Sequence, residues 1–171
     1  LGLGSGIEAG VEKMKNPGVT LNSAYLRPRS RGSVRLKSAN PSDAPLIDPN
    51  YWADPHDREM SIRGLKLAQE IMHQKALAPF IKREMIPGPE VKTDEDYFNY
   101  ACRHAKTDHH PAGTCRMGND ERAVVDPELK FNGLDGLRVV DASIMPTLIS
   151  SNTNAAAIMI GEKAADMIAR E

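Results

Sequence analysis

The sequence predicts an α+β fold: a small antiparallel sheet with helices, followed by a terminal strand, loop and helix. Three observations support this class. Two short strand-like runs flank a turn-like segment at residues 27–32. Two helical segments follow, each opened by a residue that caps helices well. An apolar run at 137–140 precedes a loop and a long helix, and no internal repeat occurs in the chain.

Residues 1–18 contain alternating glycines that resemble a dinucleotide-binding turn only superficially. Gly2, Gly4 and Gly6 are present, but the G-x-G-x-x-G pattern would need its third glycine at Ile7, and no strand precedes them. We therefore interpret residues 1–18 as a flexible terminus.

The expected sheet begins after this terminus. Residues 21–26 and 33–37 are strand-like, and the Arg-rich segment between them is typical of a hairpin-like connection. The density of Pro, Asp and Asn at 39–54 predicts a long ordered loop or a linker without regular structure.

A helix is predicted from residue 55 onward. Asp54 can cap it, Pro55 suits its first turn, and Asp57 lies at the positive end of the helix dipole. The apolar residues that follow at helical spacing predict one buried stripe: Met60, Gly64, Leu67, Ala68 and Ile71.

Two further helices are predicted. The first runs from Thr93, a capping residue followed by acidic residues, to about His104. The second begins after Asn154 or Asn152, either of which can cap it. Its polar residues share one narrow arc, so most of this helix is expected to be buried; they are Glu162, Lys163, Asp166 and Arg170.

Composition excludes several classes of protein. Lys plus Arg number 22 against 23 for Asp plus Glu, without a basic stripe, which argues against nucleic acid as a partner. No run of about 18 apolar residues is present, and the first residues lack a secretory-signal pattern. Two cysteines indicate free thiols, so we expect a cytoplasmic chain, with peripheral membrane association open for a complete enzyme. The opening at Leu1 without Met suggests a piece of a longer protein.

Residues 110–118, here called the histidine segment, carry the first chemical signal. Pro111 restricts His110 to an extended backbone, and Gly113 allows a turn or a close approach. A histidine held in this way can be aimed at a substrate. The alternative is a histidine that only makes a structural hydrogen bond.

Residues 140–154, here called the aspartate segment, end where the final helix begins. An asparagine at this point stabilises a helix start by roughly 1 kcal/mol. The free amides and positive dipole of a helix start also suit a phosphate or an anionic ring. A cap and a ligand site are compatible interpretations.

Together these segments resemble the signature of the glucose-methanol-choline (GMC) oxidoreductases. The matching patterns are His-Pro-x-Gly-Thr-x-x-Met-Gly at 110–118, Leu-Arg-Val-Val-Asp-Ala-Ser-x-Met-Pro at 137–146 and Asn-x-Asn at 152–154. Residues 26–34 and 47–51 also resemble the family's substrate-domain pattern. The resemblance covers about residue 20 to the end and is greatest to choline dehydrogenases and aliphatic alcohol dehydrogenases.

The resemblance implies a role for individual residues. His110 matches the active-site histidine over the flavin, and Asn152 matches a second active-site position. The positions that correspond to FAD-binding ones are Asp141, Ala142, Asn152, Thr153 and Asn154. His109 departs from the aromatic residue that many relatives carry, and adjacency to Pro111 favours His110 over it.

The implied reaction is oxidation of a small-molecule alcohol by FAD. His110 would take the hydroxyl proton, Asn152 would orient the substrate oxygen, and hydride would pass to flavin N5. Both side chains should then face one cleft, with His110 at the end of a strand and Asn152 at or just before the final helix.

The resemblance also implies a division of the chain. Residues 19–136 would form part of a substrate-binding domain, and residues 137–171 would complete an FAD-binding domain. The Gly-rich βαβ unit that holds the FAD phosphates does not occur in this sequence. We therefore expect a partner in the missing amino-terminal portion of the same enzyme, and a chain that alone lacks FAD and activity. A homo-oligomer or a swap of the final helix is also open.

Two alternatives come from other classes. One is a zinc-binding module, because five potential ligands lie within 14 residues, counted from 102 to 115; they are Cys102, His104, His109, His110 and Cys115. Their spacing does not match paired zinc ligands. The other is a noncatalytic binding domain, which the residue types at 110 and 152 disfavour.

Overall fold

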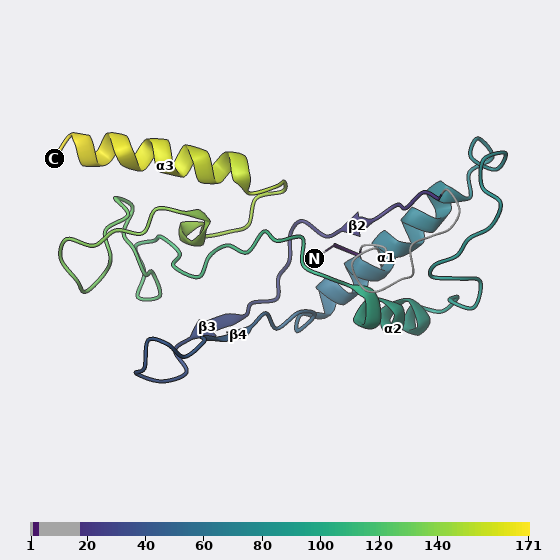
Figure 1. The fold of residues 1–171 in the computed structure, drawn as a ribbon, viewed down its shortest axis with the longest axis horizontal. Helices are drawn as coiled ribbons and strands as arrows, with labels where there is room; N and C mark the ends of the chain where they lie inside the picture. Colours follow the sequence, from purple (N-terminus) through teal and green to yellow (C-terminus); the bar gives the residue numbers. More distant parts are fainter. Residues whose placement is uncertain (1, 4–17) are drawn as a thin grey trace. The chain divides into compact units, whose positions relative to one another are not determined.

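The computed structural model describes residues 2–3 and 18–171, and these form two compact units (Figure 1). Unit 1 comprises the described residues of Leu1–Arg31 together with Tyr51–Asp108, and unit 2 comprises Gly32–Asn50 and His109–Glu171. Residues 109–136, which we assigned to a substrate-binding domain, therefore cluster with the carboxy-terminal residues. No helix in the described part of the chain has the length and apolarity needed to cross a membrane.

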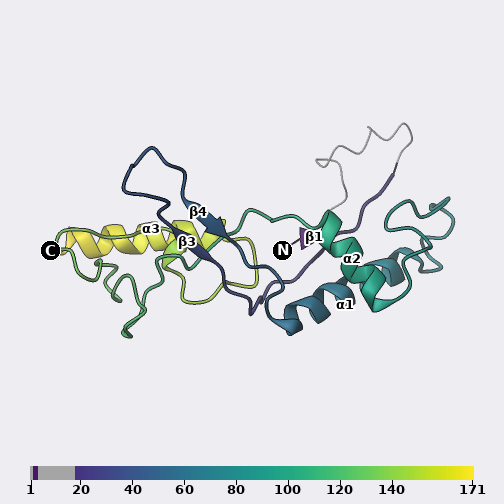
Figure 2. The ribbon, with the colours of Figure 1, turned by 90° about the horizontal axis from the view of Figure 1, so that it is seen from below.

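Unit 1 is built on the helices α1 (Pro55–Met72) and α2 (Asp94–His104), which Figure 2 shows packed together. Asp54 caps α1 by accepting a hydrogen bond of 2.8 Å from the His56 amide. Thr93 and Asp96 form a reciprocal capping box at the start of α2. Both predicted helix starts are confirmed.

The face that α1 buries differs from the predicted stripe. Leu67 and Ile71 are exposed, at 56% and 43% of their full accessibility. The buried face instead contains Ile62 and Leu65, which pack on Tyr97 and other residues of α2. The stripe prediction was wrong because it assumed that polar side chains lie outside; the residues buried on α1 are Asp57, Ser61, Ile62 and Leu65.

The Asp57 carboxylate can be buried because backbone amides of an adjoining loop satisfy its oxygens. It accepts backbone hydrogen bonds from Arg29, at 2.9 and 3.1 Å, and from Ser30, at 2.7 Å. Burial raises the pKa of Asp57, but the hydrogen bonds from Arg29 and Ser30, together with the nearby His56, bring it below its ordinary value of 3.8. Asp57 therefore secures residues 29–30 to the first turn of α1.

The predicted strands exist, but they do not pair with each other. In unit 1, β1 (Gly2–Leu3) pairs antiparallel with β2 (Ser23–Ala24). Residues 1 and 4–17, where the rest of the expected flexible terminus falls, lie outside the described residues.

In unit 2, β3 (Ser33–Arg35) pairs antiparallel with β4 (Leu46–Asp48), and Val34 lies opposite Ile47. The predicted hairpin across residues 27–32 was therefore wrong. The prediction that residues 39–54 have no regular structure was also wrong, because β4 lies within them. The apolar residues Leu46 and Ile47 belong to β4. A side chain at Gly32 would lie 2.1 Å from the Asp48 carbonyl, so this hairpin requires glycine.

The rest of unit 2 is mostly irregular chain around an apolar core, followed by α3 (Asn154–Ala169). Residues 137–140, predicted as a strand, form only an isolated bridge between Lys130 and Arg138. The carbonyl of Leu137 accepts from Phe131, but no neighbouring strand among the described residues continues the ladder. The core residues are Val125, Leu129, Ile144, Met145, Ile160 and Ala164.

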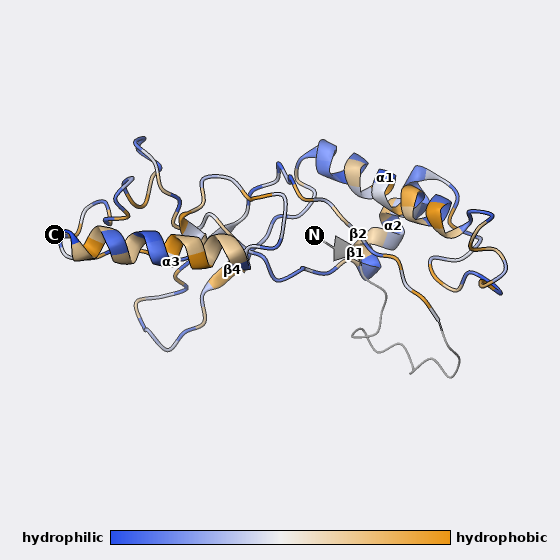
Figure 3. Cartoon of the chain, turned by 90° about the horizontal axis from the view of Figure 1, so that it is seen from above, coloured by the Kyte–Doolittle hydropathy of each residue, from blue (hydrophilic) through white to orange (hydrophobic). Residues whose placement is uncertain are grey.

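Most of α3 is exposed, so the prediction that this helix is mainly buried was wrong. Only Ile160 and Ala164 are buried, whereas Ile158 and Met159 are 60% and 58% exposed. Figure 3 shows both apolar and polar bands along this helix. Apolar residues do occupy much of the surface of α3, as predicted. The rest of unit 2 buries only the side that carries Ile160 and Ala164.

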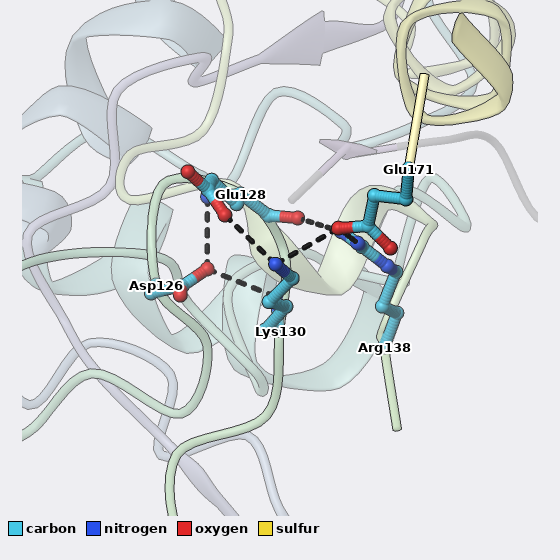
Figure 4. Close-up of polar contacts among 5 residues, drawn as sticks. All are labelled: Asp126, Glu128, Lys130, Arg138 and Glu171. Carbon is cyan, nitrogen blue, oxygen red and sulfur yellow. Dashed lines mark hydrogen bonds and ion pairs between the residues drawn. The ribbon is translucent and has the colours of Figure 1, made fainter. Parts of the chain in front are cut away.

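An ion cluster fixes the carboxyl-terminal end of α3 to a loop of unit 2 (Figure 4). Glu171 pairs with Arg138 and lies 2.8 Å from the Lys130 ammonium, which in turn lies 3.0 Å from Glu128. Hydrogen bonds from Arg138 and then Lys130 lower the pKa of Glu171 from 4.5 to about 2.

Candidate active site

The histidine segment and the aspartate segment lie side by side in unit 2. Three backbone amides of the first donate to successive carbonyls of the second. Their N···O distances are 3.4 Å for Gly113 to Ala142, 3.0 Å for Cys115 to Ser143 and 2.8 Å for Met117 to Ile144. Two segments separated by more than twenty residues therefore form one structural element.

Local backbone conformation makes this approach feasible. Gly113 has φ of +83°, a conformation that side chains rarely adopt, and a Cβ there would lie 3.2 Å from the Met145 carbonyl. Asp141 caps the short 3-10 helix η1 (Ala142–Ile144) by accepting from the Ser143 amide at 2.7 Å. Both devices hold the aspartate segment against the histidine segment.

His110 reaches the start of α3 through its ring. Its Nδ1 lies 3.0 Å from the Thr153 hydroxyl oxygen, and the ring is half-buried. Thr153 is buried, with 8% exposure, and is the cap residue of α3. His110 does not end a strand, contrary to prediction, because the Pro111 segment is irregular here.

Thr153, rather than an asparagine, occupies the cap position. Its backbone is α-helical and its side chain makes no capping hydrogen bond, so the predicted cap by Asn154 or Asn152 was wrong. The expected position of Asn152 just before the final helix is confirmed, and its side chain is exposed. The contact from Thr153 to His110 escaped sequence reasoning, because 43 positions separate the two residues.

The start of α3 leaves the amides of its first turn without a side-chain acceptor from the cap residue. The first turn contains no acidic side chain, and no side-chain cap bond from Thr153 occupies its amides. Ala142 is half-buried beside the histidine segment, whereas the side chain of Asp141 is exposed. These residues fit a group bound at this helix start.

The potential zinc ligands are divided between the two units. Cys102 and His104 belong to unit 1, while His109, His110 and Cys115 belong to unit 2. Among the described residues, no three His, Cys, Asp or Glu side chains are placed to share a metal ion. The zinc alternative therefore gains no support.

His109 and His110 differ in geometry although they are adjacent. His109 is exposed and has φ of +60°, whereas His110 is half-buried and bonded to Thr153. The left-handed backbone at His109 turns the chain immediately before Pro111 restricts it. The His110 ring is oriented by the residue that starts α3.

Comparison with known proteins decides the family. Residues 28–161 match the GMC oxidoreductase family model for the carboxy-terminal region. The chain belongs to the GMC oxidoreductases. It is 51% identical over 154 residues to an alcohol dehydrogenase [acceptor] of Pseudomonas putida, covering 90% of this chain and 28% of that protein. It is 48% identical over 159 residues to an oxygen-dependent choline dehydrogenase of Escherichia coli, covering 93% and 28%.

Solved structures of other GMC-like enzymes share the fold. A pyridoxine 4-oxidase from Mesorbium loti superposes with a TM-score of 0.80 at 40% identity, covering 85% of this chain and 28% of that one. An FAD-dependent oxidoreductase from Chaetomium thermophilum gives a TM-score of 0.77 at 33% identity, covering 85% and 26%. The chain thus spans about 28% of the length of the curated relatives it matches.

Proposed function

We propose that this GMC chain is the carboxy-terminal part of an FAD-dependent alcohol dehydrogenase of the choline dehydrogenase type. The rest of that enzyme would supply the Gly-rich unit for the FAD phosphates. Residues 137–171 would complete its FAD-binding domain, and residues 19–136 would contribute to its substrate-binding domain. The alcohol-oxidising relatives above support this assignment.

One observation carries the proposal: the half-buried ring of His110 bonds the residue that starts α3, next to Asn152. With Nδ1 engaged by Thr153, Nε2 is the nitrogen available to a substrate. An imidazole so placed can accept the proton of an alcohol hydroxyl. Asn152 would hydrogen-bond the same oxygen and fix its orientation.

The bound FAD would supply the acceptor for the hydride that leaves the alcohol carbon. The protein would stabilise the negative charge and orient the substrate hydroxyl. The amides at the start of α3 would favour negative charge beside them, because this first turn carries no acidic residue. His110 and Asn152 would hold the hydroxyl so that its proton and the hydride depart from adjacent atoms.

The test replaces each histidine of the pair in the complete enzyme. His110→Ala should lower kcat/KM for choline or an aliphatic alcohol by at least about 10²-fold, as loss of a general base does. His109→Ala is the matched control and should change kcat/KM much less. Equal losses from both variants would contradict the base assignment, and a larger loss from His109→Ala would reverse it.

The isolated chain offers a second check. Purified alone, it should be colourless and inactive, because most FAD contacts would belong to the missing portion. An absorption spectrum with flavin bands would show that this chain holds the cofactor by itself.

A further inference from the structure

We infer that Thr153 is a positioning residue that selects the tautomer of His110 in which Nε2 is free to accept a proton. This inference rests on the proposed role of His110 as the base. It assigns to the Thr153 hydroxyl a task separate from holding a cofactor or capping a helix.

The geometry supports this separation. A threonine before a helix usually accepts a hydrogen bond from an amide of the first turn. The Thr153 hydroxyl makes no such bond and instead lies 3.0 Å from His110 Nδ1. It is buried at 8% exposure, so water competes poorly for this contact.

The tautomer follows from the chemistry of a base. A neutral imidazole carries one N–H, and Nε2 can accept a proton only when that hydrogen is on Nδ1. Nδ1–H then donates to the Thr153 oxygen. After proton transfer the ring is a cation with an N–H on both nitrogens, and its bond to Thr153 becomes charge-assisted and stronger. A hydroxyl can also donate to an unprotonated Nδ1. Only the arrangement in which it accepts from Nδ1–H leaves Nε2 free and continues into the charge-assisted bond of the protonated ring, and this arrangement is the one assigned to Thr153.

The backbone helps to fix the pair. Pro111 restricts the backbone of His110, and the amides of Gly113 and Cys115 bind the aspartate segment, which leads into α3. The ring of His110 lies on one of the two hydrogen-bonded segments, and the hydroxyl of Thr153 lies on the other. The pairing of the segments therefore limits how far these two groups can move apart.

The experiment uses the complete enzyme and the substitution Thr153→Val, which removes the hydroxyl at nearly constant volume. The rate of flavin reduction in an anaerobic single turnover should fall roughly 10- to 100-fold, as expected for a hydrogen bond to a charged group. Substrate affinity and flavin content should stay within about twofold. Thr153→Ser should restore most of the rate. Thr147→Val, at an exposed threonine of the same segment, is the matched control and should leave the rate unchanged.

A second readout does not depend on activity. In enzyme labelled with ¹⁵N-histidine, the His110 resonances, assigned by their loss in His110→Ala, should show Nδ1 protonated and Nε2 unprotonated in the neutral ring. Thr153→Val should give a mixture of tautomers. An unchanged tautomer in Thr153→Val would overturn the inference.

A double-variant cycle separates this inference from the proposed function. If Thr153 acts through His110, Thr153→Val should have little further effect on the reduction rate of His110→Ala. A full additional loss would show that Thr153 acts elsewhere. A slow His110→Ala enzyme with a fully active Thr153→Val enzyme would overturn this inference alone, whereas a fully active His110→Ala enzyme would overturn the proposed function.

Discussion

Unit 1 and unit 2 are stabilised in different ways. In unit 1, two regular helices pack on each other, and their starts are set by residues within three positions of each cap. In unit 2, hydrogen bonds between distant loop segments hold the histidine segment to the aspartate segment. Packing of regular helices therefore defines the first unit, and backbone pairing between distant loop segments defines the second, where the candidate active site lies.

This difference indicates which substitutions should affect chemistry and which should affect stability. Changes at unit 2 loops can alter the reaction because the reacting groups depend on backbone register. Changes in unit 1 should act mainly through its own packing. The following predictions test that division, from the largest expected effect to the smallest.

The largest effect is expected from matched asparagines in the two units. Asn152→Ala in the complete enzyme should lower kcat/KM roughly 10²-fold, because it removes a polar group that orients the substrate oxygen. Asn99→Ala, at an exposed position on α2 of unit 1, should leave kcat/KM unchanged. Steady-state kinetics with choline or an aliphatic alcohol measures both. A comparable loss at Asn99 would refute the division between the units.

Asp57 tests how a loop is anchored to α1 in unit 1. Asp57→Ala should destabilise the loop at residues 29–30 by about 2–3 kcal/mol, since two amides lose a charged acceptor. Hydrogen exchange at Arg29 and Ser30 measures the change. Asp54→Ala, which removes only the α1 cap, should cost about 1 kcal/mol.

The pH dependence of this anchor has a defined sign. The pKa of Asp57 is lower in the folded chain than its ordinary value of 3.8, so its contribution to stability is present above that pH. The contribution should disappear as the pH falls through the folded value. Protection of the Arg29 and Ser30 amides that persists unchanged in strong acid would contradict the proposed anchor.

Gly113 tests the long-range pairing in unit 2. Gly113→Ala should cost about 1–2 kcal/mol because alanine disfavours positive φ, with further strain from the nearby Met145 carbonyl. Faster hydrogen exchange at Cys115 and Met117 would report it. Gly133→Ala is the control, since Gly133 also has positive φ but an added Cβ there would meet no atom within 4 Å. Equal effects near both glycines would rule out crowding at Met145.

The smallest effect is expected at Glu171. Glu171→Gln should weaken the ion cluster with Arg138 and Lys130 only slightly, because exposed ion pairs are screened by solvent and salt. Its contribution to stability should be complete above pH 4.5 and fall away toward pH 2, following its lowered pKa. Exchange at the last amides of α3, compared at low and high salt, measures the effect. If Glu171→Gln lowered stability more than Asp57→Ala does, the expected order of the two carboxylates would be wrong.

The sequence predicted what depends on neighbouring residues. The caps at Asp54 and Thr93 were identified because their partners lie within three positions. The family, and with it the fold class in outline, could be recognised from the spacing of the histidine and aspartate segments. The roles of His110 and Asn152 remain predictions.

The errors arose where distant residues decide the outcome. The buried face of α1 depends on hydrogen bonds from Ser30 to Asp57 and from Trp52 to Ser61, which make burial of these two polar residues favourable. The pairing of β3 with β4 instead of β2 depends on a residue-by-residue register that the turn signals did not specify. Thr153 was placed near a cofactor by resemblance, but its bond to His110 follows only from the folded chain.

The bond between His110 and Thr153 also has a consequence for how the site assembles. During synthesis, the histidine leaves the ribosome 43 residues before its hydroxyl partner. Closing so long a loop costs conformational entropy, which one side-chain bond does not offset, so the backbone pairing of the two segments and the packing of Ile160 and Ala164 must act with it. Until that helix docks, the hydrogen bond between His110 and Thr153 cannot form. The pair can therefore assemble only after α3 has been synthesised.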